Sequence, residues 1–117
     1  MSDFSIYHNP RCSKSRQTLL LLEQHGITPE IVLYLEQPPS KNQLKTLLRK
    51  LGLSARELLR SGEDEYRTLN LGDQSLSEDA LLDAMHTHPK LIERPIVVHG
   101  ERAIIGRPPE SILELIA

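Results

Sequence analysis

Residues 4–35 read FSIYHNPRCSKSRQTLLLLEQHGITPEIVLYL, and this stretch predicts the centre of the fold. Phe4–Tyr7 combines apolar and aromatic residues just before the turn signal Asn9-Pro10, which is typical of a short strand. Ser13–His25 contains a run of leucines and is followed by Gly26, which indicates a helix that ends at a glycine. The continuous apolar run 31–35 is typical of a buried parallel strand. We therefore predict a right-handed β-α-β unit.

The middle of the chain predicts helices with clear start signals. Leucines at helical spacing follow Ser40, a favoured helix-capping residue, and Gly52 is expected to end that helix. The segment 54–57 has the sequence of a capping box and predicts a second, short helix that carries Leu58, Leu59 and Arg60. Residues 61–76 are polar and are expected to be irregular, and Ser77 is expected to cap a further helix.

Two strands and a last helix are predicted near the C-terminus. Ile96–His99 and Arg102–Ile105 have the composition of short strands, and Gly100-Glu101 between them predicts a two-residue hairpin of type II′. Pro108-Pro109 is expected to open a helix over residues 110–116. The order β-α-β, several helices, β-β-α favours an α/β layer structure.

Length and composition fit one globular domain over residues 1–117, with a helical insertion at about 40–75. The formal net charge of −2 gives no general reason to bind nucleic acid or an anionic membrane. No apolar run of about 18 residues is present, so we expect no transmembrane span, and the N-terminus lacks the pattern of a signal peptide. A single cysteine excludes an intramolecular disulfide, and we expect a reducing cytoplasm.

Cys12 is the residue that most strongly predicts chemistry. It lies where the first strand runs into the first helix, and a helix start offers free backbone N–H groups and the positive end of the helix dipole. Arg11, Lys14 and Arg16 add positive charge, and His8 can add more when it is protonated. Such surroundings lower the pKa of a thiol, and the thiolate is the reactive form. A lone cysteine is more often a small buried hydrophobe, but these polar neighbours fit that interpretation poorly.

Two further patterns add to this prediction. Cys12 begins a C-x-x-S sequence that ends at Ser15, and with no second cysteine in the chain a modified Cys12 must be released by an outside thiol. Arg94 and Arg107 each precede a proline beside one of the last two strands. A guanidinium group suits a tetrahedral oxyanion because it donates two parallel hydrogen bonds, although either arginine alone is more simply a surface ion pair.

Together these residues resemble the ArsC family, the arsenate reductases that depend on glutathione and glutaredoxin. The resemblance covers essentially the whole chain and rests on the segments His8–Arg16, Leu58–Arg60, Glu93–Ile96 and Ile105–Pro108. It implies a thioredoxin-like (glutaredoxin-like) α/β sandwich with a mixed four-stranded sheet and the helical insertion. In that arrangement the X-Pro bond before the third strand lies beside the reactive cysteine and is often cis, which makes Pro95 the cis-proline candidate.

The resemblance also implies roles for the site residues. Cys12 would be the nucleophile, His8 and Ser15 would tune its thiolate, and the oxyanion site would be formed by Arg60, Arg94 and Arg107. Attack of Cys12 on arsenate would give a covalent thioester. Glutathione would attack next as the co-substrate, and glutaredoxin would take up the glutathione and leave arsenite. Sulfate or phosphate would mimic arsenate, and we expect no bound cofactor and no metal.

Other functions are weighed against this one. Phosphatase-like arsenate reductases use C-x5-R, but Thr18 stands where that arginine would be. A regulatory protein of the Spx class, which binds RNA polymerase, typically carries C-x-x-C, and Ser15 takes the place of its second cysteine. A one-cysteine, glutaredoxin-like thiol transferase is the remaining alternative.

Two polar clusters are given simpler interpretations. His86, His88 and His99 do not predict a metal site, since no cysteine joins them and the dipole of a helix end explains the first two. The acidic run Glu63–Glu65 is interpreted as solvated.

Overall fold

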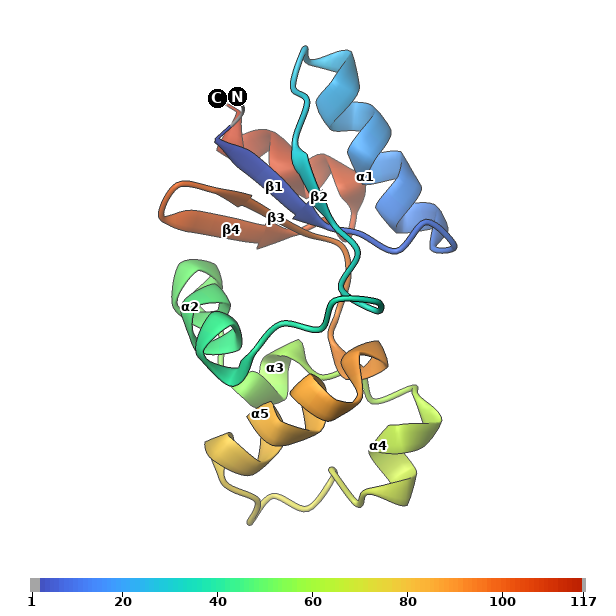
Figure 1. Ribbon diagram of the computed structural model, residues 1–117, viewed down its shortest axis with the longest axis vertical. Coiled ribbons are helices and arrows are strands. Elements are labelled where there is room, and N and C mark those ends of the chain that lie inside the picture. Colours follow the sequence, from blue (N-terminus) through green and yellow to red (C-terminus); the bar gives the residue numbers. More distant parts are fainter. Residues whose placement is uncertain (1–2, 117) are drawn as a thin grey trace. The chain divides into compact units, whose positions relative to one another are not determined.

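The protein is described by a computed structural model that covers residues 3–116 (Figure 1). The described chain forms two compact units. The sheet unit comprises the residues up to Gln37 and those from Arg94 onward, and the helical unit comprises Pro38–Glu93. Each unit is described by itself. Our prediction of a single domain with an insertion at about 40–75 stays a prediction.

The sheet unit contains a mixed four-stranded sheet, as the sequence predicted. Its strands lie in the order β2-β1-β3-β4, and they are β1 (Phe4–Tyr7), β2 (Glu30–Val32), β3 (Ile96–His99) and β4 (Arg102–Ile105). β1 is parallel to β2 and antiparallel to β3, and β3 is antiparallel to β4. The β3–β4 connection is the predicted hairpin, in which Gly100 has the positive φ, +62°, that the first position of a type II′ turn needs.

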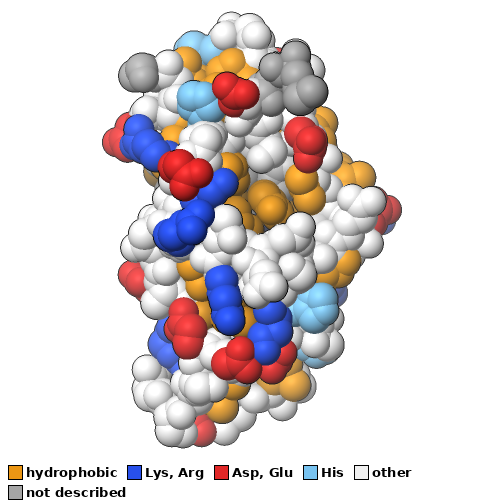
Figure 2. Space-filling model, turned by 60° about the vertical axis from the view of Figure 1, so that its left-hand side comes forward, with side chains coloured by type: hydrophobic (Ala, Val, Ile, Leu, Met, Phe, Trp, Pro, Cys, Tyr) orange, Lys and Arg blue, Asp and Glu red, His pale blue; other side chains and the backbone are white. Residues whose placement is uncertain are grey.

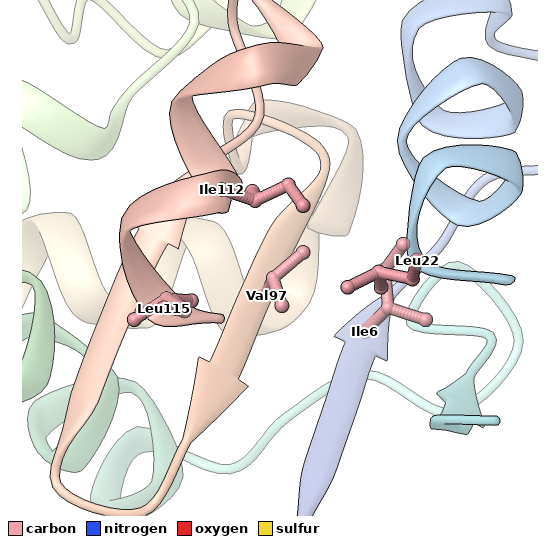
Figure 3. Close-up of a cluster of buried hydrophobic side chains, with 5 residues drawn as sticks. All are labelled: Ile6, Leu22, Val97, Ile112 and Leu115. Carbon is pink, nitrogen blue, oxygen red and sulfur yellow. The ribbon is translucent and has the colours of Figure 1, made fainter. Parts of the chain in front are cut away.

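One hydrophobic cluster holds two helices on the sheet (Figure 3). Ile6 of β1 is paired with Val97 of β3, so both side chains project from the same face. Leu22 reaches this cluster from α1 (Ser13–Gln24), and Ile112 and Leu115 reach it from the 3₁₀ helix η2 (Pro109–Leu115). Since all five side chains are buried together, α1 and η2 cover the same face of the sheet. This packing holds α1, and with it the helix start at Ser13, against the sheet.

The second strand differs from the prediction. We expected a buried strand over 31–35, but β2 ends at Val32 and Ile31 is 47% exposed. β2 lies at the edge of the sheet, next to β1. After Val32 the chain turns, and the carbonyl of Leu33 accepts hydrogen bonds from the backbone N–H of Glu36 and of Gln37 at 3.0 and 2.8 Å. An apolar run alone therefore did not distinguish an edge strand and turn from a central strand.

The helical unit contains four α-helices and one 3₁₀ helix among its described residues. They are α2 (Lys41–Leu51), α3 (Ala55–Leu58), α4 (Asp64–Thr68), α5 (Glu78–Thr87) and η1 (Pro89–Leu91). The three predicted serine caps are confirmed, because the hydroxyls of Ser40, Ser54 and Ser77 each accept a backbone N–H from the first turn of their helix. The predicted helix end at Gly52 is confirmed by its left-handed conformation, with φ of +70°.

Two local predictions in the helical unit were wrong. Residues 61–76 were expected to be irregular, but α4 forms within them and Arg67 bonds Asp64 across its surface at 2.7 Å. The short helix was expected to carry Leu59 and Arg60, but α3 ends at Leu58. Leu59 instead forms an isolated antiparallel bridge with Ile92, and this pairing removes the following residues from the helix.

The charges on the surface and the length and hydropathy of the helices agree with what the composition indicates. On the face drawn in Figure 2, acidic side chains lie among the basic ones, in keeping with a net charge of −2. No helix within residues 3–116 is both long and apolar enough to cross a membrane.

Candidate active site

Cys12 caps the N-terminus of α1 in the sheet unit. The chain leaves β1 through His8, whose backbone N–H donates to the Val32 carbonyl at 2.9 Å. It then turns at Asn9, whose carbonyl accepts from the Cys12 N–H at 3.0 Å. Cys12 has extended backbone angles, and its carbonyl accepts the first helical hydrogen bond, from Arg16. The residue is 9% exposed, so Cys12 lies in a largely enclosed place at a helix start.

The pKa of the Cys12 thiol is lowered by this position. Burial alone raises it, but the backbone N–H of Ser15, the guanidinium group of Arg94 and the backbone N–H of Lys14 lower the pKa and together outweigh burial. The two N–H groups act as the positive end of the helix although neither meets the geometry of a full hydrogen bond to the sulfur. The result is a thiol that ionises more readily than a free cysteine.

Two arginines from the far end of the sequence lie at this sulfur. Nη2 of Arg107 donates to Cys12 Sγ at 3.6 Å, and Nε of the same guanidinium donates to the Arg94 carbonyl at 2.7 Å. The second bond orients the guanidinium toward the sulfur. The peptide bonds Arg94-Pro95 and Arg107-Pro108 are both cis. The structure therefore brings together Cys12, Arg94 and Arg107.

His8 and Ser15 form a buried pair behind the cysteine. His8 Nδ1 lies 2.6 Å from Ser15 Oγ, and the Asn9 backbone N–H donates to the same oxygen at 3.0 Å. Burial and the charge of Arg16 hold the pKa of His8 below its usual value. We predicted that a protonated His8 would add positive charge, and the lowered pKa disfavours that form at neutral pH. The role of His8 and Ser15 in tuning the thiolate stays a prediction. We expect them to act through the hydrogen bonds that hold the loop between β1 and α1.

Arg60 belongs to the helical unit and is described within it. Its Nη1 donates to Glu93 Oε1 at 2.7 Å and its Nε to Glu63 Oε2 at 3.4 Å, while its backbone N–H donates to the Leu91 carbonyl. Glu63 was interpreted as part of a solvated acidic run, but it is a partner of Arg60 and only 25% of its side chain is exposed. The role of Arg60 in oxyanion binding stays a prediction.

Gly106 is a residue that sequence reasoning missed. Its N–H donates to the Pro95 carbonyl at 2.9 Å, and a Cβ on it would lie 2.6 Å from Thr18 Oγ1 of α1. Only a glycine lets the backbone that carries Arg107 pass so close to the helix that carries Cys12. The signal available in the sequence was the glycine directly before the motif arginine.

Replacing Gly106 is expected to disturb both stability and the position of Arg107. Gly106→Ala should lower the free energy of unfolding by about 1–3 kcal/mol, since Thr18 and Pro95 must move apart. Chemical denaturation measures this, with Gly62→Ala as the control because no atom lies within 4 Å of a Cβ there. Equal stability of the Gly106→Ala and Gly62→Ala variants would contradict this packing argument.

The described residues offer no metal centre, since within 3–116 no three His, Cys, Asp or Glu side chains gather as ligands. His86 Nδ1 bonds the Pro39 carbonyl and His99 Nδ1 bonds the Leu115 carbonyl, so both rings have structural partners.

The lowered pKa predicts how Cys12 reactivity depends on pH. Only the thiolate is alkylated, so the rate should fall as the pH drops through the pKa of Cys12, with a midpoint below the value of about 8.5 for a free cysteine. Arg94→Gln should move the midpoint upward, because it removes a cation that favours the thiolate. Iodoacetamide kinetics measure both, with Arg102→Gln as the control. An unshifted midpoint in the Arg94→Gln variant would contradict this assignment.

Comparison with known proteins extends over nearly the whole chain. The pattern of the ArsC family matches residues 7–115. The chain is 61% identical to "Uncharacterized protein YfgD" of Escherichia coli K12, over 95% of this chain and 94% of that protein. It is 50% identical to a protein of Haemophilus influenzae named arsenate reductase, over 95% of this chain and 97% of that one. A solved structure named arsenate reductase from Vibrio cholerae superposes with a TM-score of 0.93 at 57% identity, covering 95% of both chains.

These likenesses agree with the fold and with the sequence motifs. The predicted thioredoxin-like α/β fold is confirmed by the mixed sheet and by the superposition on the Vibrio cholerae structure. The matched region includes the cysteine segment and both arginine–proline pairs. The chain therefore belongs to the ArsC family.

Proposed function

We propose that this protein is an oxidoreductase that reduces arsenate to arsenite, with glutathione and glutaredoxin as the source of electrons. The observation that carries the proposal is the guanidinium of Arg107 at 3.6 Å from Cys12 Sγ, beside a thiol whose pKa is lowered. Relatives that cover nearly the whole chain are named arsenate reductase, which supports the choice of oxyanion. Because the reactive thiol must be kept reduced, we also propose a cytoplasmic location.

The charge arrangement suits a tetrahedral oxyanion. Arsenate and a thiolate repel each other, and the reaction requires that this repulsion be screened where sulfur meets arsenic. Arg107 and Arg94 supply two positive groups at Cys12, and a guanidinium donates two parallel hydrogen bonds to such an anion.

The proposed reaction balances with two thiols. The Cys12 thiolate attacks arsenic, a sulfur–arsenic bond forms, and one arsenate oxygen leaves as water after protonation. Glutathione then supplies the second thiol, because the chain contains no other cysteine. The two thiols give two electrons to As(V), which leaves as arsenite, and they are oxidised to a disulfide. Glutaredoxin reduces that disulfide and restores free Cys12.

An omission assay tests this function. The purified protein is supplied with arsenate, glutathione, glutaredoxin and a glutathione-reducing system, and arsenite is quantified by chromatography with arsenic-specific detection. We expect arsenite only when the protein and glutathione are both present, a large loss of turnover without glutaredoxin, and competition by sulfate or phosphate. A protein that binds none of these anions and forms no arsenite would fit a polymerase-binding regulator instead.

A further inference from the structure

A groove lies beside the cysteine loop in the sheet unit. Its volume is about 300 Å³, and it is lined by Asn9, Pro10, Arg11, Leu33, Leu35 and Glu36. One wall follows β1 and the other follows β2, so the groove opens at the carboxyl ends of two parallel strands. That edge of a sheet is a frequent place for ligands in α/β folds. Since Arg11 directly precedes Cys12, the groove begins next to the reactive residue.

Both walls of the groove are held in place by backbone hydrogen bonds. The His8 N–H donates to the Val32 carbonyl at 2.9 Å and joins the two walls where the strands end. On one side the Arg11 N–H donates to Asn9 Oδ1 at 3.0 Å, and on the other the Leu33 carbonyl accepts the two bonds that close the turn before Glu36. The groove is therefore formed by ordered backbone and needs little rearrangement to accept a ligand.

The groove carries one positive and one negative side chain on an apolar floor. Arg11 and Glu36 are exposed, and within residues 3–116 neither side chain has an ion-pair partner. Leu35, 38% exposed, contributes apolar surface to the groove, together with Pro10 and Leu33. Such a groove suits a small ligand that has a carboxylate and an ammonium group close together and a short aliphatic chain.

We propose that this groove binds the γ-glutamyl end of glutathione and so presents the glutathione thiol to modified Cys12. Arg11 would bind the γ-glutamyl carboxylate, Glu36 would bind its ammonium group, and the methylene groups would lie on Leu35. This proposal rests on the proposed function, which requires an outside thiol at Cys12. It adds the site from which that thiol attacks. We expected Arg11 to add positive charge at Cys12, but the groups that lower the pKa of its thiol are Ser15, Arg94 and Lys14.

The test uses S-methylglutathione, which has the same charged ends but no free thiol. Titrated into the isotope-labelled protein, it should shift the amide signals of Asn9, Arg11 and residues 33–36. Arg11→Gln and Glu36→Gln should each raise its Kd about tenfold, since each loses one charge-assisted contact. The matched controls are Arg102→Gln and Glu23→Gln, which remove exposed charges of the same unit outside the groove.

Steady-state kinetics separate this proposal from the proposed function. Arg11→Gln and Glu36→Gln should raise the KM for glutathione about tenfold while the KM for arsenate and the alkylation midpoint of Cys12 stay unchanged. Groove shifts without arsenate reduction would leave the glutathione site standing and overturn the function. Glutathione-dependent reduction with an unchanged KM and no shifts in the groove would overturn the glutathione site alone. A rise only in the KM for glutaredoxin would also overturn it, in favour of a docking surface for that protein.

Discussion

Cys12→Ser is expected to abolish arsenate reduction, lowering kcat/KM by more than about a thousandfold. A serine hydroxyl at this position stays protonated, and even if it formed an ester with arsenate, its oxygen could not donate the electrons that reduce As(V). The fold should persist, because serine is a favoured residue at the start of a helix and Cys12 makes no capping hydrogen bond of its own. Arsenite formation and thermal unfolding should be measured on the same preparation.

The serine variant isolates chemistry from structure. Cys12→Ala provides the comparison, since it removes the sulfur without adding a hydroxyl, and it should be equally inactive. Both variants should still bind sulfate weakly, because Arg94 and Arg107 remain. Reduction by either folded variant at more than a few per cent of the wild-type rate would contradict the assignment of Cys12 as the nucleophile.

Arg107→Ala is expected to lower kcat/KM for arsenate by roughly a hundredfold, the usual effect of removing one donor to a developing anion. Arg107 both contacts the sulfur and is oriented by its bond to the Arg94 carbonyl, so its loss leaves the anion and the thiolate less well screened. Arg107→Lys should recover only part of the activity, because an ammonium group keeps the charge but cannot donate two parallel hydrogen bonds. Arsenite formation at varied arsenate concentration measures both variants.

The control for Arg107 is Arg102→Ala, which removes an exposed arginine of β4 that lies 3.9 Å from the carboxylate of Glu114. This variant should keep wild-type kinetics. If Arg107→Ala matched Arg102→Ala in kcat/KM for arsenate, the guanidinium beside the sulfur would have no part in oxyanion chemistry.

The strands and caps were predictable because their signals are local. The turn at Gly100 and the serine caps depend on residues within four positions of each other, and the structure has them as expected. β2 was predicted too long because the same apolar residues serve an edge strand and a turn. α4 was missed because its sequence lacks an apolar face, and none of its residues is buried.

In the candidate site too, features set by neighbouring residues could be predicted, whereas contacts between residues far apart in the sequence could not. The position of Cys12 at a helix start followed from the residues around it, because backbone N–H groups are a property of any helix start. The contact of Arg107 with Cys12 spans 95 positions in the sequence, so it was expected only from the resemblance to a family. The Arg94 carbonyl as the partner of Arg107 has no local signal, and the glycine before Arg107 does not by itself reveal its close approach to Thr18.

The most direct test compares two pH profiles of the wild-type protein: the alkylation rate of Cys12, and kcat/KM for arsenate with saturating glutathione and glutaredoxin. Because the thiolate of the free enzyme is the proposed nucleophile, both should rise through the same midpoint, below about 8.5. Agreement of the two midpoints would support attack by a Cys12 thiolate of lowered pKa. An alkylation midpoint at or above the value for free cysteine, or arsenate reduction that rises through a different pH, would contradict it.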